Sequence, residues 1–175
     1  QPERSTSRRW GRPVRSATAA ANCSRVSGLA LNTSGTASWM AAYYTAQVYE
    51  FEGNISRALA YARRASELGG TCGDHRAVYS SANQHGVLAL RDSRFGEAAE
   101  RFQAALQYGG EMGMDALAAA IVRDNLGYCL MCTGSVEEGV SLCRDAAATV
   151  EALGAKQFLP EIYQDLCFGA LQHSD

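Results

Sequence analysis

The chain has 175 residues, 47% of them hydrophobic, which is enough to form a single domain with a substantial core. No stretch approaches the roughly 18 consecutive apolar residues of a membrane span, and six cysteines in a chain of this length do not resemble the disulfide framework of a small secreted domain. We therefore expect a cytoplasmic protein with reduced thiols. Fifteen arginines against one lysine, with abundant alanine, are typical of a bacterial protein from a GC-rich genome.

The charge is uneven, and its basic part lies at the N-terminus. Residues 1–37 carry +5 from six arginines and one glutamate, so the total of −2 leaves −7 on residues 38–175. We expect residues 1–13 to be a disordered basic leader, because they lack apolar periodicity and contain two prolines. An organellar transit peptide and an arm that binds nucleic acid or anionic lipid are the alternatives for this leader.

Four stretches of the chain share a pattern of apolar or small residues at offsets of 3, 7 and 10, and their first members lie 41, 40 and 41 residues apart. The stretches are Val14/Ala17/Ala21/Ser24, Ile55/Ala58/Ala62/Ala65, Phe95/Ala98/Phe102/Ala105 and Val136/Gly139/Cys143/Ala146. On an α-helix these offsets place all four residues on one face. A period of about 40 residues indicates helical units that bury their apolar faces by stacking on neighbours. Residues 14–175 therefore predict an all-α, right-handed α-solenoid of stacked antiparallel helix pairs.

Signals for helix starts and ends divide this region into eight expected helices. Asn54 and Asp74 are suited to cap helix N-termini, and Ser135 begins a capping-box pattern. The paired glycines at 69–70 and 109–110 are expected to end helices. The expected helices span about 14–28, 38–52, 55–68, 75–91, 95–108, 114–131, 135–153 and 160–171.

The helix pairs resemble the tetratricopeptide repeat over about residues 14–171. The best match is the run NLGYCL at 125–130 followed by GSVEEG at 134–139, which is similar to the family's small residue in the first helix, glycine at the turn and small residue in the second helix. The corresponding small residues are Ala46, Gly86 and Gly127 in first helices and Ala58, Ala98 and Gly139 in second helices.

The chain also departs from the family pattern. Its period is 40–41 residues instead of about 34, and Ala62 and Cys143 stand where the family has a large second-helix residue. These features are similar to the longer-period arrays of kinesin light chains and of sensor segments in bacterial regulators. A different stacked-helix repeat is the alternative, because other solenoids share this period.

In the family, the inner face of the superhelix comes from first-helix residues that flank the small position, so the resemblance implies a peptide-binding groove there. Its members here are Tyr43, Tyr44, Gln47, Glu50, Asn83, Gln84, Arg91, Asp124, Asn125, Tyr128 and Met131. The amides and the aspartate suit hydrogen bonding to a partner's backbone, and the tyrosines offer rigid contact area. Ordinary solvation of an exposed helix face is the alternative for any one of these residues. The family's basic clamp for a C-terminal carboxylate is not reproduced.

Cysteine and histidine residues give little support for catalysis or metal binding. Cys129 and Cys132 form a C-x-x-C on an expected helix, and two ligands are too few for a closed zinc site. Cys72 and His75 could supply two more, but the spacing does not require the segments to meet. We expect the cysteines, Cys143 above all, to be small buried apolar residues. The sequence has no phosphate-binding loop, nucleophile elbow or H-E-x-x-H motif, and we expect no enzymatic activity, metal or cofactor.

The sequence therefore predicts a non-catalytic protein–protein or peptide interaction module that holds a partner segment in a concave groove. The alternative is an effector-sensing regulatory segment of a larger bacterial transcriptional regulator or signalling ATPase. We expect a protein or peptide partner and no membrane, with nucleic acid reached only through the basic leader or an attached domain.

Overall fold

The computed structural model describes residues 35–172, so the expected leader at 1–13 and helix at 14–28 lie outside the described residues. Within residues 35–172 the chain forms seven α-helices and a short 3₁₀ helix, η1, and no strand. The elements are α2 (Gly35–Phe51), α3 (Ile55–Thr71), α4 (His75–Arg91), α5 (Phe95–Glu111), α6 (Ala116–Cys132), α7 (Val136–Ala152), η1 (Lys156–Phe158) and α8 (Leu159–Gln172). None of these helices is long and apolar enough to cross a membrane.

The prediction that the paired glycines end α3 and α5 is wrong. Both helices continue to Thr71 and Glu111 because the first glycine of each pair is a packing position. A Cβ on Gly69 would lie 2.1 Å from the Cβ of Ala77 on α4, a distance that real side chains do not reach. The glycine therefore permits the close approach of two helices, and Gly109 has the same function against a methionine side chain of the following loop.

Most connections contain three residues and reverse the chain in the same way. Their second residue has positive φ, the left-handed conformation that glycine adopts without steric cost, as at Gly73 (φ 64°) and Gly134 (φ 98°). Ser93 occupies this place between α4 and α5 with φ 58°, although it has a Cβ. The short length of these turns makes consecutive helices antiparallel neighbours.

Three helix N-termini in the described chain are capped by a side chain. Asn54 Oδ1 accepts from the backbone N of Arg57 at 3.2 Å, and Asp74 Oδ1 accepts from that of Arg76 at 3.0 Å, as predicted. Asp115 caps α6 in the same way. Ser135 makes no side-chain capping bond, so the predicted capping box is wrong.

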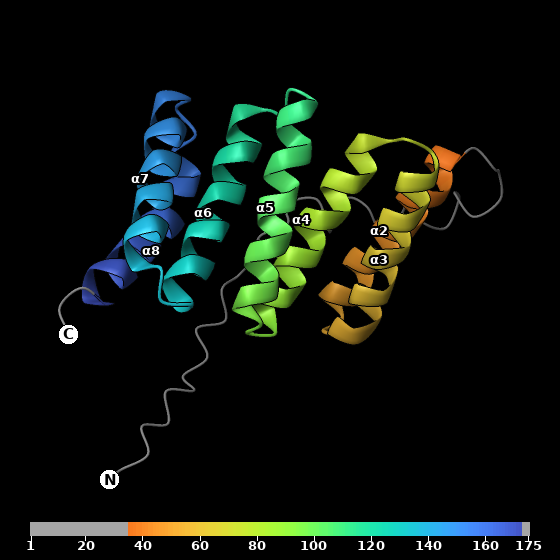
Figure 1. The fold of residues 1–175 in the computed structure, drawn as a ribbon, viewed down its shortest axis with the longest axis horizontal. Helices are drawn as coiled ribbons and strands as arrows, with labels where there is room; N and C mark the ends of the chain where they lie inside the picture. The colour runs from red at the N-terminus through yellow and green to blue at the C-terminus, as the bar shows by residue number, and fades with distance from the viewer. Residues whose placement is uncertain (1–34, 173–175) are drawn as a thin grey trace, which may run out of the picture.

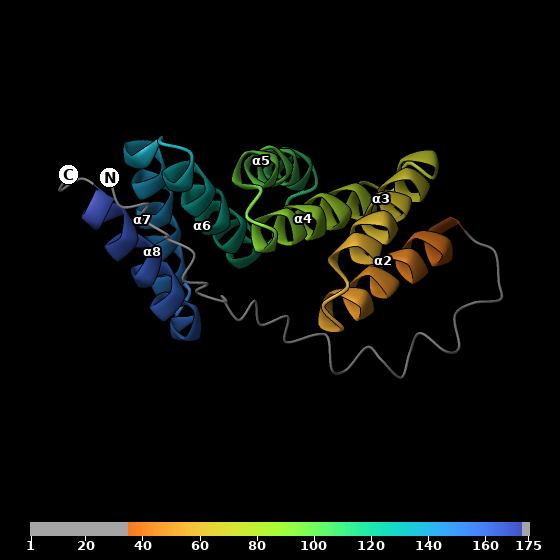
Figure 2. The ribbon, with the colours of Figure 1, turned by 90° about the horizontal axis from the view of Figure 1, so that it is seen from below.

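The helices form two layers of a curved row. Each second helix, α3, α5 or α7, contacts both the first helix before it and the first helix after it. The first helices also contact one another along the row, from α2 to α4, α6 and α8, whereas no two second helices of the described chain do so. The first helices therefore lie on the inner side of the curve (Figures 1 and 2). This arrangement is an α-solenoid of stacked helix pairs, as the period predicted.

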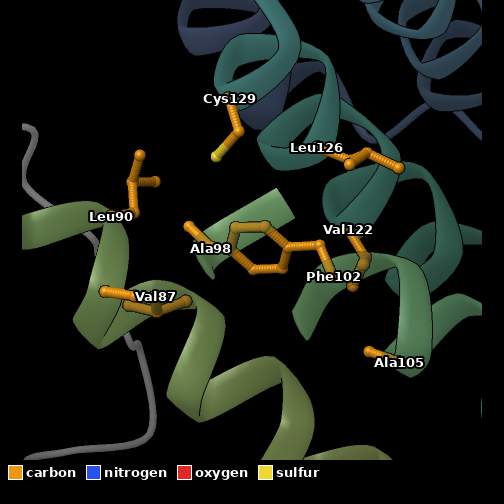
Figure 3. Close-up of a cluster of buried hydrophobic side chains, with 9 residues drawn as sticks. Val87, Leu90, Ala98, Phe102, Ala105, Val122, Leu126 and Cys129 are labelled. Atoms are coloured by element: carbon orange, nitrogen blue, oxygen red, sulfur yellow. The ribbon is translucent and has the colours of Figure 1, made fainter. Parts of the chain in front are cut away.

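The repeated offsets of the sequence are the buried positions of the second helices. The second to fourth members of the three patterns within the described chain are all buried: Ala58, Ala62, Ala65, Ala98, Phe102, Ala105, Gly139, Cys143 and Ala146. In the central cluster, Phe102 of α5 is fully buried with Val87 of α4 and Val122 and Leu126 of α6 around it (Figure 3). Each second helix is thus at the centre of a cluster of buried apolar residues that it shares with the first helices before and after it.

Candidate binding face of the first helices

The predicted groove residues lie on α2, α4 and α6, in the inner layer, but they differ in exposure. Five are buried: Gln47, Glu50, Gln84, Asp124 and Met131. Five are half-buried, and Arg91 is exposed; the half-buried residues are Tyr43, Tyr44, Asn83, Asn125 and Tyr128. Glu50 and Gln84 take part in a contact between units, and the half-buried and exposed members are the more accessible ones.

A polar cluster joins the first helices of two consecutive units. Nε2 of Gln84 on α4 donates to Oε2 of Glu50 on α2, and Nη1 of Arg91 lies 2.7 Å from Oε1 of the same carboxylate. Both oxygens of Glu50 are therefore bound by α4, and the Glu50 side chain is only 9% exposed. Because an ionised carboxylate is costly to bury without partners, the cluster fixes the position of α2 relative to α4. The Arg91 side chain is 37% exposed, so part of its guanidinium faces solvent.

Aromatic side chains gather on α2 beside this cluster. The rings of Trp39 and Tyr43 meet edge to face at 6.2 Å, and those of Tyr43 and Tyr44 at 5.6 Å. Burial raises the pKa of Tyr43 to about 12, so its phenol is neutral at physiological pH. Trp39 Nε1 donates to Asp74 Oδ2 at 3.1 Å, which ties α2 to the turn before α4. The aromatic group on α2 is therefore attached through Trp39 to the turn before α4.

Three buried side-chain oxygens on α2 and α4 have no hydrogen-bond partner among residues 35–172. They are Gln47 Oε1, Ser81 Oγ and Asn83 Oδ1. Most buried polar atoms in folded proteins are hydrogen-bonded, so a group of such atoms on two neighbouring helices is unusual. Gln47 and Asn83 were predicted site residues, whereas Ser81 was not predicted.

On α6 the predicted residues separate into core and surface. Met131 is 1% exposed and packs against Gly139 of α7 and Gly169 of α8, so it belongs to the core and not to the binding face. Tyr128 is half-buried, with its ring 5.4 Å from that of Phe168 on α8 and 6.2 Å from that of Phe95 on α5. Phe168 was not predicted, although it lies 40 residues after Tyr128, one period along the chain.

The cysteine and histidine side chains of the described chain differ in burial and contacts. Within the described chain no three His, Cys, Asp or Glu side chains are placed to hold a metal ion. Cys72 is exposed and Cys129 is buried, so the four-ligand zinc hypothesis receives no geometric support. Cys143 is buried at the helix contact, as predicted. His85 is also buried, and its Nε2 donates to Glu97 Oε1 at 2.7 Å, which joins α4 to α5.

Comparisons with known proteins identify the fold. The apo form of RapI superposes with a TM-score of 0.74 at 14% identity, over 90% of this chain and 56% of that one. BtubC (BKLC) from P. vanneervenii superposes with a TM-score of 0.73 at 17% identity, over 91% of this chain and 65% of that one. A kinesin light chain from Podosopora anserina with nearly identical TPR-like repeats superposes with a TM-score of 0.58 at 12% identity, over 90% of this chain and 84% of that one.

The chain spans less than two thirds of the length of the first two of these structures. No protein-family model matches the sequence, and a search of curated proteins gives no match either. Identities below 20% carry information on the fold and not on the partner. The chain has the tetratricopeptide-like fold, a helical repeat in the form of an all-α solenoid.

Proposed function

We propose that the inner layer formed by α2, α4, α6 and α8 binds an extended segment of a partner protein, without catalysing a reaction. The observation that carries the proposal is the contact of first helices along the row, which second helices of the described chain do not make. The inner residues of successive units are thereby fixed side by side before a partner arrives. A preformed surface loses little conformational entropy on binding, so most of the ordering cost falls on the partner segment.

The chemistry of the α2–α4 part supports recognition of a polypeptide backbone. The half-buried Asn83 holds a carbonyl oxygen without a partner among residues 35–172, and rotation of its amide would present this oxygen to a backbone N–H group of an extended segment. Tyr44 on α2 offers a half-buried ring next to that of Tyr43. Satisfying buried acceptors is favourable, because an unpaired one costs about 1–3 kcal/mol.

The α6–α8 part supports recognition of an apolar side chain. Tyr128 and Phe168 form a half-buried aromatic pair there, and aromatic contact area is a common source of binding energy. A partner segment should therefore combine backbone contacts at α2 and α4 with a large apolar residue placed near Tyr128.

The test is affinity for a peptide selected on the intact chain from a random displayed library. Replacing both Asn83 and Asn125 by alanine should weaken binding of that peptide by about 1–3 kcal/mol, the net value of two hydrogen bonds, as measured by calorimetry. The melting temperature should stay unchanged if the amides contact the partner and do not hold the fold together.

A matched control removes two polar side chains from the outer layer. Arg64 and Glu67 of α3 are 62% and 68% exposed, and their double alanine variant should bind the same peptide as the parent does. Equal affinity of the Asn83/Asn125 variant and the parent would reject the assignment of the inner face, as would a loss confined to the outer-layer variant.

A further inference from the structure

Two aromatic groups of the inner layer each contain a predicted, half-buried tyrosine. Tyr44 belongs to the first group, where its ring meets that of Tyr43 on α2 at 5.6 Å. Tyr128 of α6 belongs to the second, where its ring meets those of Phe95 on α5 and Phe168 on α8. Because Tyr44 and Tyr128 are half-buried, each ring is supported by its neighbours and keeps part of its surface open to a partner.

Helix α4 separates the two groups in the row. It contacts both α2 and α6, whereas α2 and α6 make no contact with each other in the described chain (Figure 1). The axes of packed helices lie about 8–10 Å apart, so the two steps from α2 to α6 cover about 16–20 Å across the row.

Successive first helices are also displaced along their axes, in the same direction at both steps. Trp39, the fifth residue of α2, donates to Asp74, which directly precedes α4. At the equivalent place of α4, burial and the carboxylate of Asp115, which directly precedes α6, raise the pKa of Tyr79. The start of each helix is thus level with the second turn of the one before. Because side chains span part of this distance, the displacement is about three to five residues, or about 4–7 Å, per step.

This displacement adds to the places of the two tyrosines within their helices. Tyr44 is the tenth residue of α2, and Tyr128 is the thirteenth of α6. Two steps and three further residues move Tyr128 about 12–19 Å along the helix axes relative to Tyr44. Combined with the distance across the row, the path between the rings is about 20–27 Å, or about six to eight residues of extended chain.

The accessible residues assigned to the inner face carry no unpaired charge. Asn83 and Asn125 are half-buried amides, and the exposed Arg91 is paired with Glu50, whose Oε1 lies 2.7 Å from its Nη1. A charged side chain of the partner would lose water on this face without gaining a free group of opposite charge, which is unfavourable. An uncharged segment therefore suits the inner face better than an acidic or a basic one.

We propose that the partner segment is uncharged and extended and carries two large apolar residues about six to eight positions apart, one against Tyr44 and the other against Tyr128. This inference rests on the proposed function, because it names the partner of the same inner face. The spacing selects an extended chain, since six to eight residues of α-helix span only about 9–12 Å. A segment whose apolar residues lie closer together can use only one of the two rings.

The test uses the full-length chain and the peptide selected on it from a random displayed library. Replacing either of the two large apolar residues of this peptide by alanine should lower its affinity about tenfold. In double-mutant cycles measured by calorimetry, Tyr44→Ala should remove the effect of one replacement only, and Tyr128→Ala the effect of the other. The control is Tyr61→Ala, which changes a 38% exposed ring on the outer helix α3 and should couple to neither replacement.

A second measurement changes only the peptide, so it does not depend on how the protein variants fold. Deleting four residues between the two apolar residues should lower the affinity about tenfold, to that of a peptide with one of them replaced by alanine. Replacing a residue between them by glutamate, or by lysine, should weaken binding in both cases.

The proposal is overturned if both apolar residues couple to the same ring, if the shortened peptide binds as well as the original, or if a charged residue between them strengthens binding. The proposed function survives these results when the peptide still loses affinity on replacement of Asn83 and Asn125. A peptide that is insensitive to those amides and to both tyrosines binds elsewhere, which contradicts the assignment of the inner face and this inference with it.

Discussion

The α4–α5 and α6–α7 pairs have the same helix lengths and turns, but their two helices meet through different groups. In α4–α5, a Cβ on Gly86 would meet the ring of Phe102, with its nearest carbon at 2.7 Å. In α6–α7, a Cβ on Gly127 would lie 2.6 Å from the backbone oxygen of Gly139, and a Cβ on Gly139 would lie 2.4 Å from that of Gly127. One pair places a large side chain against a glycine, and the other places two backbones against each other.

This difference shows that one helical period can hold two kinds of core. A side-chain contact can be adjusted by a compensating substitution, whereas a backbone contact moves only if the whole helix moves. The α6–α7 pair should therefore tolerate less change at its glycines, and the α4–α5 pair should depend more on one large side chain.

The largest effect is expected from Gly127→Arg. The new side chain must overpack a backbone contact, at about 1–3 kcal/mol, and it places an unpaired charge in the core, at about 3–5 kcal/mol. Chemical denaturation should show a loss of stability on the order of 5 kcal/mol, or an unfolded protein. Glu111→Arg, at an exposed helix end, is the control and should be nearly neutral. Equal melting of both variants and the parent would mean that the α6–α7 contact is assigned incorrectly.

Phe102→Ala should follow, with a loss of about 3–5 kcal/mol in the free energy of unfolding. The ring is fully buried in a cluster shared by α4, α5 and α6, so its removal leaves a cavity between two units. Urea unfolding curves measure the loss. The control is Gln103→Ala, which changes an exposed residue next to Phe102 in the sequence. Similar curves for both variants would contradict the central place of Phe102 in the core.

A pair of double-mutant cycles separates the two kinds of contact. Gly86→Ala and Gly127→Ala should each cost about 1–3 kcal/mol through overpacking. Combining Gly86→Ala with Phe102→Leu should recover part of that cost, because the smaller side chain makes room. Combining Gly127→Ala with Cys143→Ala should recover little, since the oxygen of Gly139 remains in place. Equal recovery in both cycles would remove the distinction between the pairs.

The pairs should also differ in their response to acid, because α4–α5 contains the buried His85. Burial lowers the pKa of His85 below 6.5, and Arg101 and Arg63 act in the same direction, while the hydrogen bond to Glu97 opposes them. Below pH 6.5 the unfolded chain therefore binds a proton more readily than the folded one. The contribution of neutral His85 to the free energy of unfolding is complete above pH 6.5 and is lost as the pH falls through the folded-state pKa of His85.

His85→Gln keeps a donor for Glu97 and removes this titration. Melting temperatures of the parent and the variant, measured from pH 7.5 down to the range where carboxylates titrate, should converge as the pH falls. Parallel profiles would show that His85 does not contribute to the acid sensitivity.

The smallest effect is expected from Ser93→Gly. Ser93 has φ of 58° in the turn between α4 and α5, where glycine stands in the equivalent turn between α6 and α7. A residue with a Cβ pays about 1–2 kcal/mol for this conformation, and glycine loses part of that gain through its greater freedom in the unfolded state. A net stabilisation of about 0.5–1 kcal/mol should appear as a higher melting temperature. A lower one would show that the serine side chain stabilises the turn.

Much of the candidate binding face could be placed on its helices from the sequence, but not its exposure. The period placed Tyr44 and Asn83 on first helices, and first helices line the inner side of the curve. The pattern did not reveal that Glu50 is held by two side chains of α4, or that Met131 is covered by α7 and α8. These contacts join residues one or more helices apart, and periodicity within a helix carries no information about them.

The sequence by itself determined the α-helical class, the repeat and the buried face of each second helix, because these follow from apolar residues spaced within single helices. Tertiary structure decided the ends of α3 and α5. Gly69 and Gly109 permit close helix packing inside these helices, and the chain turns at the positive-φ glycines further along, Gly73 and Gly113. Tertiary structure also decided how far each predicted residue of the inner face is exposed, from the buried Gln84 to the exposed Arg91. Such features depend on how closely neighbouring helices approach, and this distance is set by the sum of contacts across units.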